Sequence, residues 1–120
     1  MKILVVDDSR AMRMIVIRTL KQCNLGDFEI EEACNGQEAL EKIENERYHF
    51  VLSDWNMPEM KGIELLKTLR ERGNTTRFGF ITSESSADVI NEAEEAGAAF
   101  LLTKPFNAES MELQLKPVLA

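Results

Sequence analysis

The sequence is poor in the residues on which several common kinds of site depend. It has two cysteines, Cys23 and Cys34, without metal-ligand spacing, and its only histidine is His49. We therefore expect the cysteines to be buried or half-buried free thiols rather than a disulfide or a metal site. A catalytic triad, a histidine-rich metal site or an internal phosphohistidine would have to use His49, which directly precedes an apolar run and is expected in a turn.

Long apolar runs and excess basic charge are also missing. The apolar run after Met1 and Lys2 has four residues, far fewer than a secretory signal or a membrane span needs. The formal net charge of −7 argues against direct binding to nucleic acid or to an anionic membrane. With no linker or repeat, the sequence predicts a cytoplasmic protein made of one domain, residues 1–120, which we expect to be a monomer.

What the sequence does contain is a regular alternation of strand and helix signals. Short apolar runs predict strands near residues 2–7, 28–33, 50–54, 78–82 and 99–103. Apolar residues at helical spacing predict helices near residues 10–23, 36–46, 62–72, 86–96 and 107–116. Pro117 is expected to end or bend the last helix, because proline cannot donate a backbone hydrogen bond.

This alternation, with connections of a few residues, predicts right-handed β-α-β units and a parallel sheet with helices on both faces. Segment 28–33 alternates polar and apolar residues, as an edge strand would, whereas the first, third and fourth strands are apolar nearly throughout. The pattern fits an α/β fold, a doubly wound five-stranded parallel sheet of order 2-1-3-4-5. In that order the first and third strands are neighbours at the topological switch point.

Four of the predicted strands end in polar residues. The first runs into Asp7 and Asp8, the third into Asp54, the fourth into Thr82 and the fifth into Lys104. The ligand site of an open parallel sheet lies beyond the carboxyl ends of its strands, so these side chains should converge.

Three converging carboxylates repel one another, and a hard divalent cation such as Mg²⁺ would relieve the repulsion. A lysine and a threonine hydroxyl can bind the oxygens of a phosphoryl group, and an aspartate can act as its nucleophilic acceptor. Taken singly, each residue could be a helix cap, a turn residue or a surface charge. Because all of them fall at one end of one sheet, the joint pattern favours a site that binds a cation beside a phosphoryl group.

These segments resemble the receiver domain of bacterial response regulators, which has a flavodoxin-like fold, over essentially the whole chain. The segments that carry the resemblance are 5–9, 53–62, 81–83 and 104–106. Within the family, residues 54–58 and 64–68 are most similar to the single-domain chemotaxis regulators.

The resemblance implies that Asp54 accepts a phosphoryl group from a phosphohistidine on a separate, CheA-like histidine kinase. Mg²⁺ would be bound directly by Asp8, Asp54 and the main-chain carbonyl of Asn56, with Asp7 acting through water. Lys104 would pair with the phosphoryl group in a loop shaped by a cis bond to Pro105.

Four residues receive roles around the phosphoryl group from the same resemblance. Thr82 would move in to hydrogen-bond the phosphoryl group, and Ser83 would leave room for it and for its donor. Asn56 and Glu84 would flank the path of the water that hydrolyses the acyl phosphate. The protein would then accept and lose its own phosphoryl group rather than act as a classical enzyme, and a separate phosphatase could assist the loss.

The expected output is a change of affinity for a partner protein, the flagellar motor switch or another effector. One position departs from the family: Leu101 stands where an aromatic residue usually moves together with the threonine. Phe100 cannot replace that residue, because neighbouring side chains on a strand point to opposite faces. Lys61 also replaces a common aspartate before Gly62, and Pro117 is expected to shorten the last helix of the output face.

Three other functions remain open at this point. A phosphate sink would drain a kinase without an output partner. A phosphatase of the haloacid-dehalogenase type would need a second aspartate two residues after its nucleophile, where this chain has Asn56. A flavin binder would share the fold class, but the acidic loop at Asp7 and Asp8 would repel a flavin phosphate.

Overall fold

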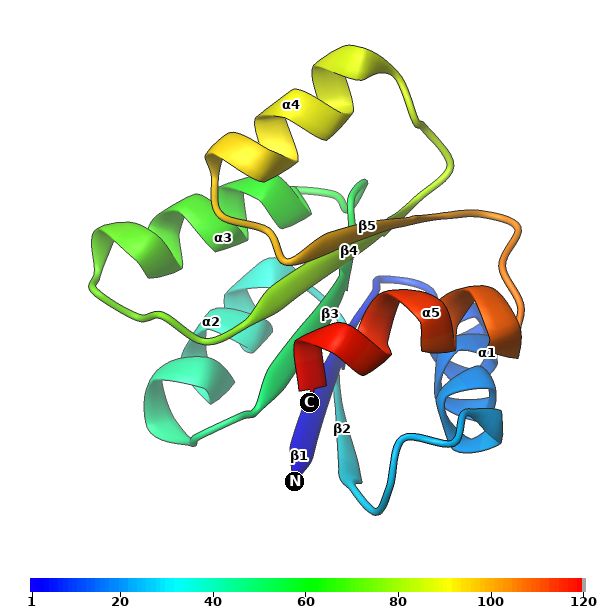
Figure 1. Ribbon diagram of the computed structural model, residues 1–120. Coiled ribbons are helices and arrows are strands. Elements are labelled where there is room, and N and C mark those ends of the chain that lie inside the picture. Colours follow the sequence, from blue (N-terminus) through cyan, green and yellow to red (C-terminus); the bar gives the residue numbers. More distant parts are fainter. Residues whose placement is uncertain (120) are drawn as a thin grey trace.

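The computed structural model describes residues 1–119, in which strands and helices alternate along the chain (Figure 1). The strands are β1 (Lys2–Val6), β2 (Glu29–Ala33), β3 (Phe50–Asp54), β4 (Phe78–Thr82) and β5 (Phe100–Thr103). The helices are α1 (Arg10–Gln22), α2 (Gly36–Asn45), α3 (Gly62–Glu71), α4 (Ala87–Glu95) and α5 (Ala108–Leu119). Within these residues no helix is long and apolar enough to cross a membrane.

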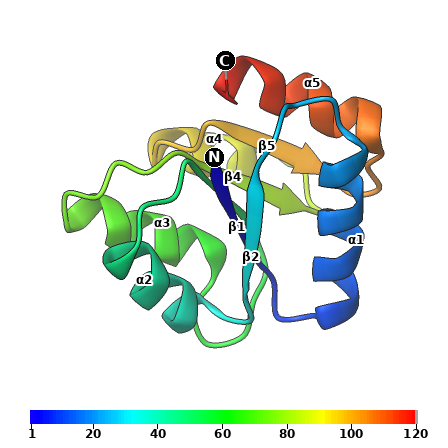
Figure 2. The ribbon, with the colours of Figure 1, turned by 90° about the horizontal axis from the view of Figure 1, so that it is seen from below.

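The five strands form one parallel sheet in the order β2-β1-β3-β4-β5, as the sequence predicts. Helices α1 and α5 cover one face of the sheet, and α2, α3 and α4 cover the other (Figures 1 and 2). Two apolar clusters fill the space between the layers, one on each face. Every residue of the central strands β3 and β4 is buried, whereas the edge strand β2 buries only Ala33.

Several helices begin with a polar cap directly after a strand and its short loop. Ser9, Asn35 and Ser86 each accept a hydrogen bond from a backbone N–H in the first turn of α1, α2 and α4. Such caps satisfy backbone donors that the helix itself leaves free. They also fix the loops that follow the strands, which is the edge of the sheet where the predicted site lies.

The prediction that Pro117 shortens the last helix is wrong, because α5 continues through it to Leu119. A proline this close to the helix end removes a single backbone hydrogen bond. Val118 and Leu119 pack against the same apolar cluster as Leu115, so tertiary packing keeps the last turn helical.

The predictions for the two cysteines and the single histidine are confirmed except for the burial of Cys34. Both cysteines are free, and Cys23 is buried, but Cys34 is exposed at the end of β2, contrary to the prediction. Cys34 lies in the loop just past Ala33, the last residue of the strand, and no further strand flanks β2 on its outer side. His49 lies in a bend, where its Nδ1 accepts a hydrogen bond from the backbone N–H of Lys2 (3.0 Å).

Candidate functional site

Three carboxylates meet where the adjacent strands β1 and β3 end. Val6 pairs with Ser53, so the next residues, Asp7 and Asp54, emerge side by side. Oxygens of Asp7, Asp8 and Asp54 lie within 4.8 Å of one another. Asp7 and Asp54 are buried, with 4% and 9% of their surface exposed, whereas Asp8 faces solvent. The group therefore has two desolvated members and one open side.

The loop after β1 is fixed by hydrogen bonds to Asp7. The Asp7 carboxylate accepts a bond from the backbone N–H of Ser9 (2.9 Å), and its main-chain carbonyl accepts one from Arg13 Nη1 (2.7 Å). Arg13 Nε in turn contacts Glu32 on the edge strand at 2.9 Å. Sequence reasoning did not identify Arg13. Its position one turn into α1, facing the end of β1, is the signal that points to it.

Lys104 reaches Asp54 from the far side of the sheet's carboxyl edge. Its Nζ lies 3.3 Å from Asp54 Oδ1, and its backbone N–H donates to the carbonyl of Thr82 (2.8 Å). The peptide bond between Lys104 and Pro105 is cis. Thr82 is fully buried, and its Oγ1 accepts a hydrogen bond from the N–H of Glu84 (3.0 Å). Ends of β1, β3, β4 and β5 thus meet in one place.

The loop between β3 and α3 begins directly after Asp54. Its first residue, Trp55, is buried, donates its N–H to Ile81 O (3.0 Å) and accepts at its carbonyl from Gly62 N (3.2 Å). Asn56 follows and is exposed at the rim. Ser83 and Glu84, in the loop after β4, are exposed as well. The structure therefore places these three residues in the loops that directly follow β3 and β4, with exposed side chains.

Leu101 and Phe100 lie on opposite faces of β5. Leu101 is half-buried and packs on the cluster beneath α2, α3 and α4, while Phe100 stacks on Phe50 in the other cluster, with ring centroids 5.4 Å apart. Phe100 therefore cannot take over the position of Leu101, as the strand alternation predicts.

Burial and mutual repulsion perturb the acidic group. Burial raises the pKa of Asp7 to about 6, with a further rise from the negative charge of Asp54, while the N–H of Ser9 opposes the shift. The pKa of Asp54 is also raised, mainly by burial, although the nearby Lys104 counteracts it. The charged state of the group is thus costly without a cation. An all-oxygen donor set with one exposed carboxylate fits a hard divalent ion such as Mg²⁺.

The raised pKa of Asp7 predicts that the metal-free protein becomes more stable when the pH falls from about 7 to about 5. The ordinary pKa is 3.8, so between that value and about 6 the folded state binds more protons than the unfolded state. Stability is therefore lost as the pH rises through this window, by about 1 kcal/mol between pH 5 and pH 7. Chemical unfolding at both pH values measures it. The variant Asp7→Asn should show a flatter profile, and an unchanged slope in that variant would contradict the assignment.

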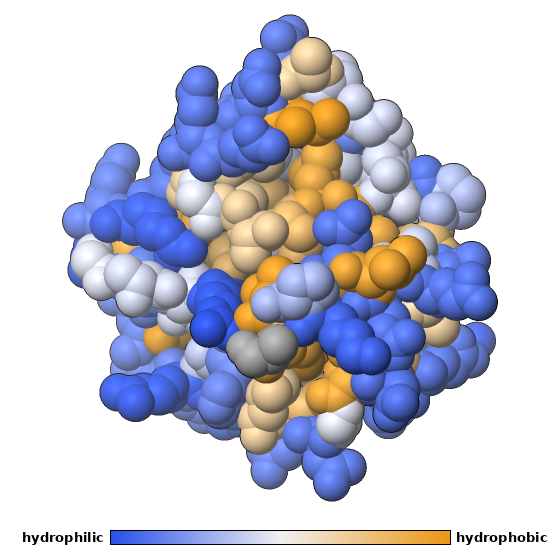
Figure 3. Space-filling model, viewed as in Figure 1, coloured by the Kyte–Doolittle hydropathy of each residue, from blue (hydrophilic) through white to orange (hydrophobic). Residues whose placement is uncertain are grey.

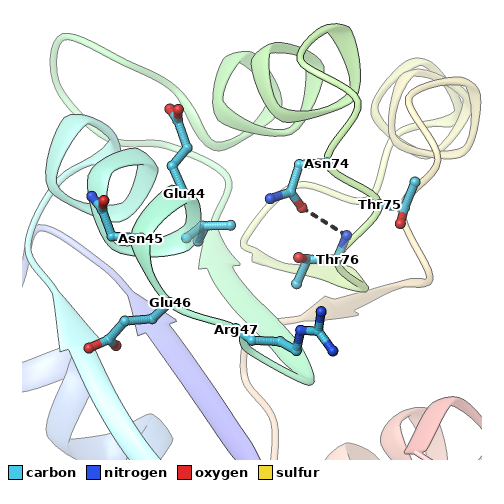
Figure 4. Close-up of a pocket in the computed structure, with 8 residues that line it drawn as sticks. Glu44, Asn45, Glu46, Arg47, Asn74, Thr75 and Thr76 are labelled. Atoms are coloured by element: carbon cyan, nitrogen blue, oxygen red, sulfur yellow. Dashed lines mark hydrogen bonds between the residues drawn. The ribbon is translucent and has the colours of Figure 1, made fainter.

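A hollow of about 540 Å³ lies at the opposite end of the sheet, between the end of α2 and the loop before β4 (Figure 4). Its labelled side chains are polar and include Glu44, Arg47 and Asn74, whose Oδ1 accepts from the N–H of Thr76 (2.9 Å). Arg47 precedes β3 and Thr76 precedes β4, so the hollow faces away from the acidic group. We therefore base the function on the carboxylate edge rather than on this hollow.

A parallel α/β sheet with three aspartates, a threonine and a lysine at its carboxyl edge is the arrangement of a receiver. Residues 3–116 match the response regulator receiver domain, and the chain belongs to this family. It is 38% identical over 120 residues to chemotaxis protein CheY-3 of Vibrio cholerae, covering 98% of this chain and 91% of that protein. It is 37% identical to chemotaxis protein CheY of Pseudomonas aeruginosa, covering 98% and 95%.

Solved structures of response regulators also resemble this chain. The high-resolution structure of the chemotaxis response regulator CheY4 of Vibrio cholerae is 37% identical, with a TM-score of 0.85, and the match covers 98% of this chain and 97% of that one. The Francisella response regulator 1452 receiver domain has a TM-score of 0.87 at 27% identity, covering 98% and 95%. The predicted resemblance and the flavodoxin-like fold are confirmed, and with them a response regulator of two-component signalling. A phosphate sink is not favoured.

Proposed function

We propose that the protein is a phosphorylation-controlled switch in chemotaxis or a related signalling pathway, with Asp54 as the acceptor of the phosphoryl group. The observation that carries the proposal is the 3.3 Å approach of Lys104 Nζ to Asp54 Oδ1, beside Asp7 and Asp8. A buried carboxylate next to a lysine and two further carboxylates suits transfer of a phosphoryl group, in which positioning and charge neutralisation supply most of the catalysis.

The metal ligands would be Asp8, Asp54 and the main-chain carbonyl of Asn56, with Asp7 holding a ligand water. Mg²⁺ bound there would neutralise charge on the phosphoryl oxygens. Lys104, now paired with the free carboxylate, would transfer its contact to the phosphoryl group. The donor is a histidine kinase of the chemotaxis type: its N–P bond breaks, and an O–P bond to Asp54 forms.

Return to the resting state would be self-dephosphorylation by water, with Asn56 and Glu84 beside its path and Ser83 leaving space. Both of the flanking side chains are exposed at the rim, which supports water access. Receiver domains are in general not classical enzymes, and we propose no turnover of a free substrate. A separate phosphatase protein is a compatible partner.

The switch would begin at Thr82. Its Oγ1 now accepts from the N–H of Glu84 (3.0 Å), and its O–H would donate a hydrogen bond to a phosphoryl oxygen on Asp54. The new charge would shift a pre-existing equilibrium of the loop after β4 and of β5, where Leu101 takes the place of the usual aromatic residue.

The output surface would be the face formed by α4, β5 and α5. Figure 3 shows apolar surface in the middle of the view, where Figure 1 has β5 between α4 and α5. On these helices Ile90 and Leu113 are 37% and 76% exposed. We propose a protein partner for this face, the flagellar motor switch or another effector, and no nucleic acid or membrane. The working unit would be a cytoplasmic monomer with one domain, residues 1–120.

Beryllofluoride, which mimics a phosphoryl group, tests the proposal. In the presence of Mg²⁺ we expect amide NMR shifts at Asp54, Thr82 and Lys104 and also along β5 and α4. Beryllofluoride without Mg²⁺ is the control and should leave the spectrum unchanged. No shift at Asp54 would overturn the acceptor assignment, and shifts confined to the acidic group would overturn the switch.

A further inference from the structure

Met60 lies so close to Gly36 that no side chain would fit at that position without displacing it. The two residues follow β3 and β2, which are separated in the sheet by β1. Gly36 is the first residue of α2, and Met60 lies in the loop between β3 and α3. A Cβ added at Gly36 would lie 2.8 Å from Met60 Cγ and Sδ and 2.9 Å from its Cβ. Real Cβ atoms essentially never approach so closely, so this packing requires glycine.

The loop that carries Met60 is otherwise exposed at its tip. Asn56, Pro58 and Glu59 are exposed, and Glu59 adopts a positive φ of 68°. Met60 N donates to Pro58 O (2.8 Å), which closes a tight turn. Met60 itself is half-buried and packs on the apolar cluster under α2 and α3. The outer half of the loop is therefore anchored by Met60, and its contact with Gly36 sets where the anchor lies.

We propose that Gly36 and Met60 are positioning residues for the metal and phosphoryl site, which act by fixing the loop that carries Asn56. The inference rests on the proposed function, in which the carbonyl of Asn56 is a metal ligand. Asn56 lies between two buried residues, Trp55, which is bound to Ile81 O, and Met57, after which comes the turn that Met60 anchors. A displaced anchor changes the direction of the Asn56 carbonyl without altering any carboxylate.

For the substitution Gly36→Ala, helix propensity and the contact with Met60 predict opposite effects. Replacing glycine by alanine within a helix ordinarily stabilises it, because alanine loses less conformational entropy. If Gly36 served α2 alone, Gly36→Ala would leave Mg²⁺ binding unchanged. If the contact positions the loop, the added methyl group must push Met60 away, since its own Cβ is among the atoms in the way.

The test is a double-mutant cycle in which Mg²⁺ affinity is measured. Binding is monitored by the fluorescence of Trp55, the only tryptophan in the sequence, which is buried next to Asp54. We expect Gly36→Ala to weaken Mg²⁺ binding at least about tenfold, since small misplacements of site groups have effects of this size. Met60→Ala should weaken it a few-fold by freeing the loop. The double variant should return to the level of Met60→Ala, because the clash is gone. Met14→Ala, an exposed methionine on α1, is the matched control and should bind as the parent protein does.

Each outcome decides between the two accounts. Parent-like Mg²⁺ affinity in Gly36→Ala, or a double variant no better than Gly36→Ala alone, would overturn the inference. If Gly36→Ala does not fold, parent-like binding by Met60→Ala overturns it, and weakened binding supports it. A parent protein that binds neither Mg²⁺ nor beryllofluoride would instead contradict the proposed function.

Discussion

Asp54→Asn should reduce magnesium-dependent labelling by acetyl phosphate to background. The amide is close in shape to the carboxylate but is not a nucleophile that can form an acyl phosphate. Lys104 can still donate to the amide oxygen, so the local geometry is largely kept. To measure labelling, the parent protein and the variant are incubated with acetyl phosphate and Mg²⁺, and the mass of one added phosphoryl group is sought by intact-protein mass spectrometry.

The same variant makes a second prediction, for a different measurement. The negative charge of Asp54 is one of the causes that raise the pKa of Asp7, so its removal should bring that pKa down toward its ordinary value. The gain in stability between about pH 7 and about pH 5 should shrink accordingly. Asp88→Asn, an exposed carboxylate in the first turn of α4, serves as control for both measurements. Retained labelling of Asp54→Asn would place the acceptor at another residue.

The meeting of Asp7, Asp54 and Lys104 could be predicted from sequence because it depends only on strand ends and strand order. Apolar runs fix where each strand stops, and the polar edge pattern of β2 fixes the order. The sheet then brings its carboxyl ends together whatever the details of side-chain packing. The prediction for Phe100 and Leu101 succeeds for the same reason, since alternation along a strand is a property of the backbone.

Contacts that depend on side-chain reach or close packing were beyond sequence reasoning. Arg13 bridges the end of β1 and the edge strand, and although its place one turn into α1 points toward β1, its contact with Glu32 depends on the reach of both side chains. The prediction that Pro117 shortens α5 failed because the packing of Val118 and Leu119 outweighs the local effect of proline on the helix. The contact between Gly36 and Met60 joins distant parts of the chain, and it becomes visible only when their separation is measured.

Gly62→Ala should destabilise the protein by about 3 kcal/mol and slow the labelling of Asp54 by at least about tenfold. A Cβ at this position would lie 2.3 Å from the main-chain carbonyl oxygen of Asp54 and 2.9 Å from the Phe80 ring. Neither obstacle is flexible, because one is the backbone of a buried strand and the other is a fully buried ring. The new methyl group must therefore displace the acceptor's own peptide or the start of α3.

Denaturant unfolding and the rate of labelling by acetyl phosphate measure the two effects separately. Lys61→Ala changes the preceding, exposed residue without filling any space near Asp54, and should alter stability by less than about 0.5 kcal/mol. A stable Gly62→Ala that is labelled at the parent rate would mean that α3 can shift without moving Asp54. The close packing at Gly62 would then serve the fold alone. Slow labelling under conditions where the variant is fully folded would instead tie the start of α3 directly to the position of the acceptor.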